Sequence, residues 1–196
     1  MAAVLVKTYE APAPDFSEAA RYARLPKTAA VPDTLKTVFA ELADTLSYKV
    51  CFAEYPIHTD GDTLDLGFAV VHSADLKKCL TDCDRVVLFA ATVGLAPDRL
   101  SEKYRRLSPE KALYANAVGA ERVEALCDEF CRDLATEHNT RPRFSPGYGD
   151  LPLALQTEVF AALDCPRKIG VTLTDTLLMT PTKSVTALVG ILKNSP

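Results

Sequence analysis

The chain has 196 residues, of which 24% are charged and 48% are apolar. This size and composition predict one soluble globular domain that buries its own core. The net charge of −4 gives no basis for binding nucleic acid or an anionic membrane, and no apolar run approaches the roughly 18 residues that span a bilayer. The six cysteines, in a sequence without a secretory leader, indicate reduced thiols and a cytoplasmic location.

The first half of the chain mixes strands and helices. Residues 1–31 are rich in Ala and Pro and predict a strand followed by a loosely packed N-terminal arm. Apolar residues then recur at helical spacing from Leu35 to Leu46, after a plausible start at Pro32. The elements expected next are a strand at 49–57, a turn at 58–62, a returning hairpin strand at 63–71, a short helix capped by Ser73 and a buried strand at 85–93.

The second half is dominated by one long helix. Pro97 opens a shorter helix, and Ser108 caps the long one, which runs to about residue 136. A loop rich in Arg, Pro and Gly follows at 137–150, and then a helix near 155–163 and closing strands at 168–173 and 184–192. Strands and helices do not alternate as βαβ units. The sequence therefore predicts an α+β fold, a single domain over residues 1–196 with a twisted, mostly antiparallel sheet flanked by helices.

The loop contains the run Arg143-Phe-Ser-Pro-Gly147-Tyr148. The planar fork of an arginine suits a carboxylate, and nearby prolines reduce the entropy lost when a loop becomes ordered. On these residues alone two interpretations stay open. One is a grip for a small anionic ligand, and the other is a surface arginine beside a packed tyrosine.

About thirty residues further on, a second run combines Leu173-Thr-Asp, Met179, Pro181 and Ser184-Val185. Together the two runs resemble the activation domain of cobalamin (vitamin B12)-dependent methionine synthase, which carries Arg-x-x-x-Gly-Tyr-Pro and then Leu-Thr-(acid)…Met-x-Pro…Ser-Val. The resemblance covers residues 110–192 well and residues 1–109 loosely.

The sequence departs from the family pattern at three points. Gly149 stands where the family has proline, and Ala187 stands where it usually has glycine. A tyrosine that follows the family's last strand and belongs to its ligand site has no counterpart in this sequence. The missing tyrosine, together with a displaced acidic residue on the long helix, favours a weaker or altered ligand site.

The resemblance implies a ligand and roles for five residues. The ligand is S-adenosylmethionine, held in a shallow groove. By position, Arg143 grips the methionine carboxylate, Gly147 lets the backbone approach closely, and Tyr148 packs near the ligand. The family's long helix supplies an acidic residue, which the best register places at Arg132. Because an arginine cannot take that role, Glu124 or Asp128 is the expected substitute.

The same helix also allows plainer interpretations. Glu124, Asp128 and Arg132 are spaced as an intrahelical ladder of charges. Cys127 and Cys131 lie on the apolar stripe, which predicts packing residues. No nearby histidine completes a zinc site for either this pair or the pair Cys79 and Cys83, so no metal site is expected.

Two functions follow from the resemblance. The first is an accessory component of a methyltransferase: a compact, free-standing chain that reactivates a cobalamin-dependent methionine synthase, or another corrinoid protein, in trans. The corrinoid-binding partner then supplies cobalamin, and a flavodoxin-type donor supplies an electron. The alternative is a non-catalytic module that senses S-adenosylmethionine or docks a corrinoid protein. A structural relative that binds neither ligand is the third possibility.

Overall fold

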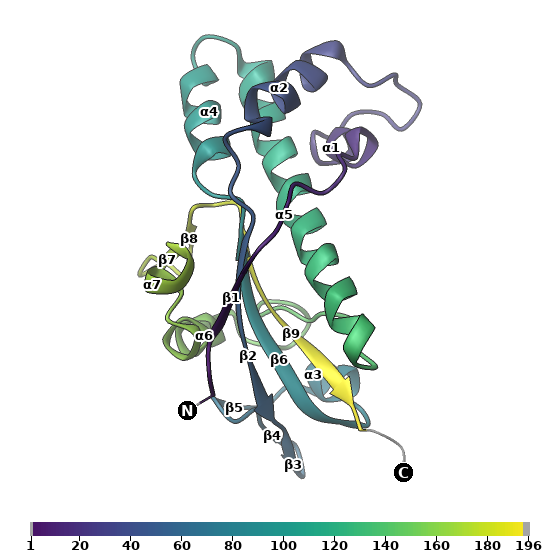
Figure 1. The fold of residues 1–196 in the computed structure, drawn as a ribbon, viewed down its shortest axis with the longest axis vertical. Helices are drawn as coiled ribbons and strands as arrows, with labels where there is room; N and C mark the ends of the chain where they lie inside the picture. The colour runs from purple at the N-terminus through teal and green to yellow at the C-terminus, as the bar shows by residue number, and fades with distance from the viewer. Residues whose placement is uncertain (1, 194–196) are drawn as a thin grey trace.

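The computed structural model describes residues 2–193, which form a four-stranded antiparallel sheet with helices packed on both faces (Figure 1). The sheet has the order β1-β2-β6-β9. Its strands span Leu5–Thr8, Lys49–Pro56, Cys83–Thr92 and Ser184–Leu192, respectively. The predicted α+β class, with an antiparallel sheet flanked by helices, is confirmed.

The strand β6 is covered on both faces. Phe89 lies in the core beneath the long helix α5 (Pro109–Glu137), and its neighbour Leu88 lies in the core on the opposite face. Successive side chains of a strand point to opposite faces, so a strand covered on both sides buries a continuous apolar run. β6 is accordingly buried from Val86 through Thr92.

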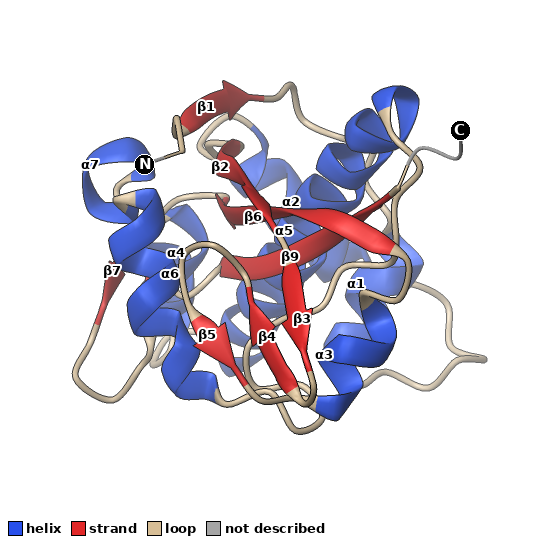
Figure 2. Cartoon of the chain, turned by 90° about the horizontal axis from the view of Figure 1, so that it is seen from below, coloured by secondary structure: helices blue, strands red, loops and turns tan. Residues whose placement is uncertain are grey.

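Short elements cover the second face. One of them is a small three-stranded sheet, β3-β4-β5, which lies at the lower end of the molecule in Figure 1 and toward the viewer in Figure 2. Apolar side chains from α3, α6, α7 and the small sheet share one core with this face of β6. These elements are β3 (His58–Asp60), β4 (Thr63–Asp65), β5 (Val70–Val71), α3 (Ala74–Cys79), a 3-10 turn at Leu153–Leu155, α6 (Gln156–Leu163) and α7 (Cys165–Ile169).

The N-terminal half of α5 extends beyond the sheet and carries a separate helical core (Figure 1). The helices α1 (Phe16–Tyr22), α2 (Asp33–Ala43) and α4 (Ala96–Tyr104) pack around it. The long helix thus joins two cores, one against the sheet and one among helices.

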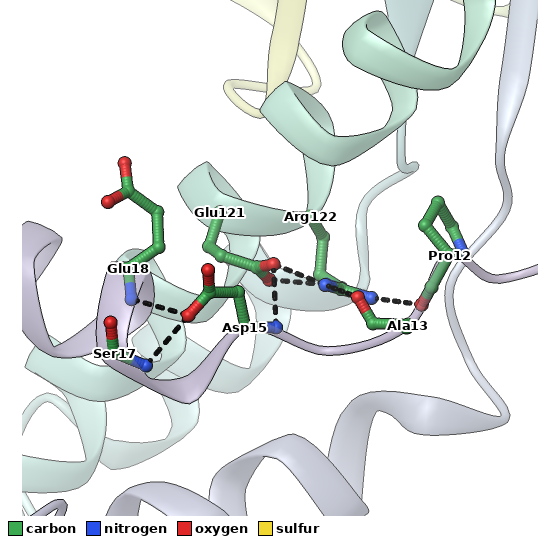
Figure 3. A network of polar contacts seen from close by, with 7 residues as sticks. All are labelled: Pro12, Ala13, Asp15, Ser17, Glu18, Glu121 and Arg122. Atoms are coloured by element: carbon green, nitrogen blue, oxygen red, sulfur yellow. Dashed lines mark hydrogen bonds and ion pairs between the residues drawn. The ribbon is translucent and has the colours of Figure 1, made fainter.

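A buried ion pair on α5 fastens the N-terminal segment to this helix (Figure 3). The side chains of Glu121 and Arg122 are only 3% and 4% exposed. Arg122 donates to the carbonyl oxygens of Pro12 at 2.6 Å and Ala13 at 3.0 Å. Glu121 accepts a hydrogen bond from the backbone N–H of Asp15 at 3.1 Å. Each buried charge therefore has both its opposite charge and a backbone partner, which such groups require.

The N-terminal segment is better ordered than the sequence predicts. The expected strand is β1, but the expectation of a loosely packed arm is wrong, because residues 16–22 form α1 and bury Ala19 completely. Asp15 caps this helix by accepting hydrogen bonds from the backbone N–H groups of Ser17 and Glu18. A helix of seven residues is too short to show a clear apolar period, so only the cap marks it in the sequence.

Two predicted strands also differ from the structure. The strand expected at 168–173 is only partly formed, because residues 168 and 169 end the helix α7 and Gly170 follows in the left-handed region (φ +73°). Only β7 (Thr172–Leu173) remains extended, paired with β8 (Met179–Thr180). Residues 58–60 of the expected turn form β3, which pairs with β4. The returning strand therefore belongs to a small sheet that is separate from the main one.

We predict that Arg122→Leu destabilises the fold by about 3–5 kcal/mol, because it leaves the Glu121 carboxylate buried without a counter-charge. Urea unfolding measures this loss. The double variant Glu121→Leu/Arg122→Leu should recover much of it, since no lone charge remains buried.

The matched control is Arg132→Leu on the same helix. Arg132 is paired with Glu129 at 2.6 Å, but its side chain is 66% exposed. Its loss should cost no more than about 0.5 kcal/mol. Equal losses at Arg122 and Arg132 would contradict the anchoring role.

Candidate functional site

The Arg/Gly loop at 138–152 lies along the outer edge of β9. Phe144 and Leu188 exchange two backbone hydrogen bonds of 2.8 Å, and the N–H of Arg141 donates to the carbonyl of Gly190 at 2.8 Å. The loop therefore acts as a short additional strand at an edge that would otherwise expose its backbone groups. This pairing fixes the position of Arg143, which lies between the two paired residues of the loop.

Arg143 reaches from the loop to the flank of α5 and pairs with two carboxylates. Its Nη2 donates to Oε2 of Glu124 at 2.6 Å, and its Nη1 donates to Oδ1 of Asp128. Glu124 and Asp128 are four residues apart, so they lie on one face of the helix. The structure thus brings together three of the five residues that the sequence predicts as site residues. Arg132 is not among them, since it pairs with Glu129.

The Arg143 guanidinium is half-buried, with 27% of its side chain exposed. Burial lowers its pKa, but the hydrogen bond to Asp128 and the nearby negative charges outweigh this effect and raise the pKa overall. Arg143 is therefore a permanent cation. Because one cation faces two carboxylates, the cluster carries a net charge of −1.

The two cysteines on this part of α5 are packing residues. Cys127 is completely buried in the core beneath the helix, and Cys131 packs against the same core. Burial raises the pKa of both thiols, so they are held in the neutral form. Among residues 2–193, no group of three or more potential metal-ligating side chains comes together.

Gly147 and Tyr148 form the turn that follows Arg143. Gly147 has φ +90°, a conformation that only glycine adopts readily, and its N–H donates to the carbonyl of Leu151 at 2.9 Å. The Tyr148 side chain is 62% exposed, and its ring lies 6.4 Å from the ring of Phe144. The turn thus presents an exposed aromatic ring next to the loop that holds Arg143.

The structure explains why Gly149 replaces a proline. Its φ is +53°, which the ring of proline excludes. A Cβ at this position would also overlap the Asp75 carboxylate, whose Cγ lies only 3.0 Å from the ideal Cβ position. The adjacent Asp150 accepts hydrogen bonds from the Ser73 hydroxyl and from the N–H of Ala74 at 2.7 Å. The end of the loop is therefore fastened to the start of α3.

An acidic groove of about 430 Å³ lies along α5, beside the Arg143 cluster. Its walls are the N-terminal segment that the buried ion pair anchors and the flank of the helix. The charged residues that line it are Asp15, Glu18, Glu121, Glu124, Asp128, Glu129 and Arg132. Sequence reasoning missed Asp15, Glu18 and Glu121, and the only local signal was Asp15 in a capping position.

Comparison with known proteins identifies the fold class first. Over all of its length the chain is similar to 80% of a solved structure described as the MetH reactivation domain bound to AdoHcy, with a TM-score of 0.74 and 15% sequence identity. At this identity the likeness establishes the fold alone, which is that of a methionine synthase reactivation domain.

The sequence comparison is more specific about the second half. Residues 124–195 match the family described as vitamin B12 dependent methionine synthase, activation domain. No curated protein matches the chain. The resemblance predicted from the two motif runs is confirmed, and the matched range contains all five predicted site residues.

We predict that Gly149→Ala costs about 2 kcal/mol of stability. About 1 kcal/mol comes from the left-handed backbone, and about 1 kcal/mol comes from displacing Asp75 from its hydrogen bond to the Asp150 N–H. Thermal or urea unfolding measures the change.

Gly61→Ala is the matched control, since Gly61 has φ +54° and nothing lies within 4 Å of its ideal Cβ position. It should lose only the backbone contribution. Equal losses for the two variants would show that the contact with Asp75 does not constrain the loop.

Proposed function

We propose that this chain binds S-adenosylmethionine between α5 and the Arg/Gly loop and presents its methyl group to the reduced cobalt of a corrinoid protein. The partner is a corrinoid-binding methionine synthase chain, which the protein reactivates in trans, with a flavodoxin-type donor supplying the electron. The family match over residues 124–195 supports this proposal, as does the solved relative, which is described as bound to AdoHcy.

The observation that carries the proposal is the position of Arg143 beside an acidic groove. S-adenosylmethionine carries a carboxylate, an ammonium group and a sulfonium. A half-buried arginine suits the carboxylate, and an acidic wall suits the two cationic groups. In this proposal Arg143 binds the carboxylate, Glu124 faces the positive charge, and Asp128 is the second acidic residue of the site. Gly147 and Tyr148 form the turn against which the ligand packs.

The chemistry needs position more than acid–base groups. A methyl group passes from the sulfonium to cobalt, and the electrons of the broken carbon–sulfur bond stay on sulfur, so no proton is moved. The residues of this chain contribute binding and orientation, which convert an encounter of two molecules into a positioned reaction. The six free cysteines, three of them buried, suit the reducing cytoplasm in which we place this activity.

A second cavity is a weaker candidate for the S-adenosylmethionine site. It has about 470 Å³, lies between β1 and the C-terminal part of α5, and is lined by none of the five predicted site residues.

The alternative of a non-catalytic sensing or docking module rests on Arg132. It stands where the family has an acidic residue, and its side chain is 66% exposed on the flank of α5. The second experiment below separates these two functions.

We predict that Arg143→Ala weakens binding of S-adenosylmethionine by about 2 kcal/mol, or roughly 30-fold, because a charge-assisted pair is lost. Isothermal titration calorimetry measures the affinity. Arg141→Ala is the control, since Arg141 donates to the carbonyl of Thr81 at 2.9 Å and lies outside the cluster. Wild-type affinity in the Arg143 variant would remove this residue from the site.

We also predict that the protein accelerates methyl transfer to cobalt only when a corrinoid protein is present. The assay follows conversion of cobalt(II) to methyl-cobalt by absorption spectroscopy, with a chemical reductant and S-adenosylmethionine. Acceleration that Arg143→Ala abolishes and Arg141→Ala keeps supports reactivation. An unchanged rate, with binding of S-adenosylmethionine intact, would instead favour the sensing or docking module.

A further inference from the structure

Both terminal nitrogens of Arg143 have carboxylate partners within the chain. Glu124 holds Nη2, and Asp128 holds Nη1. A ligand carboxylate that binds both nitrogens meets Asp128 in the same place. The guanidinium has five N–H donors, so it has enough donors for Glu124, Asp128 and a ligand carboxylate. The conflict is one of space and charge, because two carboxylates would lie side by side on one cation.

The two acidic partners differ in how firmly they are held. The Glu124 side chain is 33% exposed, and that of Asp128 is 59% exposed. A more exposed carboxylate loses less when its partner is taken away, because water replaces the contact. Asp128 is thus the partner that a ligand displaces more readily, while Glu124 stays with the arginine.

We propose that Asp128 is an internal competitor for the carboxylate site on Arg143, a role that rests on the proposed binding of S-adenosylmethionine. Asp128 holds the guanidinium against α5 in the free protein and lowers the affinity for ligands that carry a carboxylate. If a ligand displaces Asp128, the ion pair is lost. If the ligand binds beside it, the two carboxylates repel each other. Both routes lower the affinity for a ligand that carries a carboxylate, and both are absent when Asp128 is replaced by a neutral residue.

The test compares S-adenosylmethionine with decarboxylated S-adenosylmethionine, which keeps the sulfonium and lacks the carboxylate. Calorimetry gives both dissociation constants, and the readout is the ratio of the decarboxylated value to the intact value. Asp128→Asn should raise this ratio about two- to fivefold, the range expected for breaking a partly exposed ion pair. The decarboxylated compound has a net charge of +2 and the intact compound +1, so losing any nearby negative charge raises the ratio somewhat, and a matched control has to measure this general effect.

Glu129→Gln is the matched control, since Glu129 lines the same groove on the next position of the helix and pairs with Arg132. It removes the same charge, so its effect on the ratio measures the general electrostatic contribution, and Asp128→Asn should raise the ratio clearly more. In an Arg143→Ala background, Asp128→Asn should change the ratio no more than Glu129→Gln does, because the cation for which Asp128 and the ligand compete is absent.

The outcomes separate the two claims. An unchanged or lower ratio in Asp128→Asn, with intact binding of both compounds, overturns the competitor role and leaves the proposed function standing. An equal rise in Glu129→Gln also overturns it, because the effect would then belong to the groove and not to Arg143. Failure of wild-type protein to bind either compound overturns the proposed function and the competitor role together.

Discussion

The ion pair between Glu121 and Arg122 is the interaction on which the candidate site depends. Two charged side chains are almost fully buried on one helix, and together they bind backbone groups of residues 12–15. If the segment left the helix, the two charges would still pair with each other but would lose their backbone hydrogen-bond partners, which is costly for groups buried this deeply. The segment forms one wall of the acidic groove, and Arg143 lies at the flank of the other wall.

The spacing of residues along α5 places the buried ion pair and the acidic residues of the site on the same helix. Glu121, Glu124 and Asp128 follow one another at intervals of three and four residues, which places them along one side of the helix. Another side carries the apolar stripe, including Leu126, that packs on the sheet. One helix therefore sets the distance between the anchored segment and the acidic wall, while the pairing with β9 places the loop that carries Arg143.

The elements with a strong local signal were predictable. Ser108 and a long apolar period marked α5, and continuous apolar residues marked β6. The helix α1 was missed because its stabilisation comes from contacts with α2 and α5 rather than from its own short sequence. Arg143, Glu124 and Asp128 were expected at one ligand site through the family resemblance, but their direct contact was not predicted. It depends on the pairing of the loop with the edge of β9, a long-range contact with no local sequence signature.

A crystal structure of the protein with S-adenosylmethionine tests the central claim most directly. The account predicts ligand density between α5 and the Arg/Gly loop, with the carboxylate on Arg143 and the sulfonium toward the acidic groove. The segment at residues 12–15 should keep its contacts with the buried ion pair. Ligand bound elsewhere, for example in the cavity beside β1, or ligand in the groove without contact to Arg143, would contradict the account.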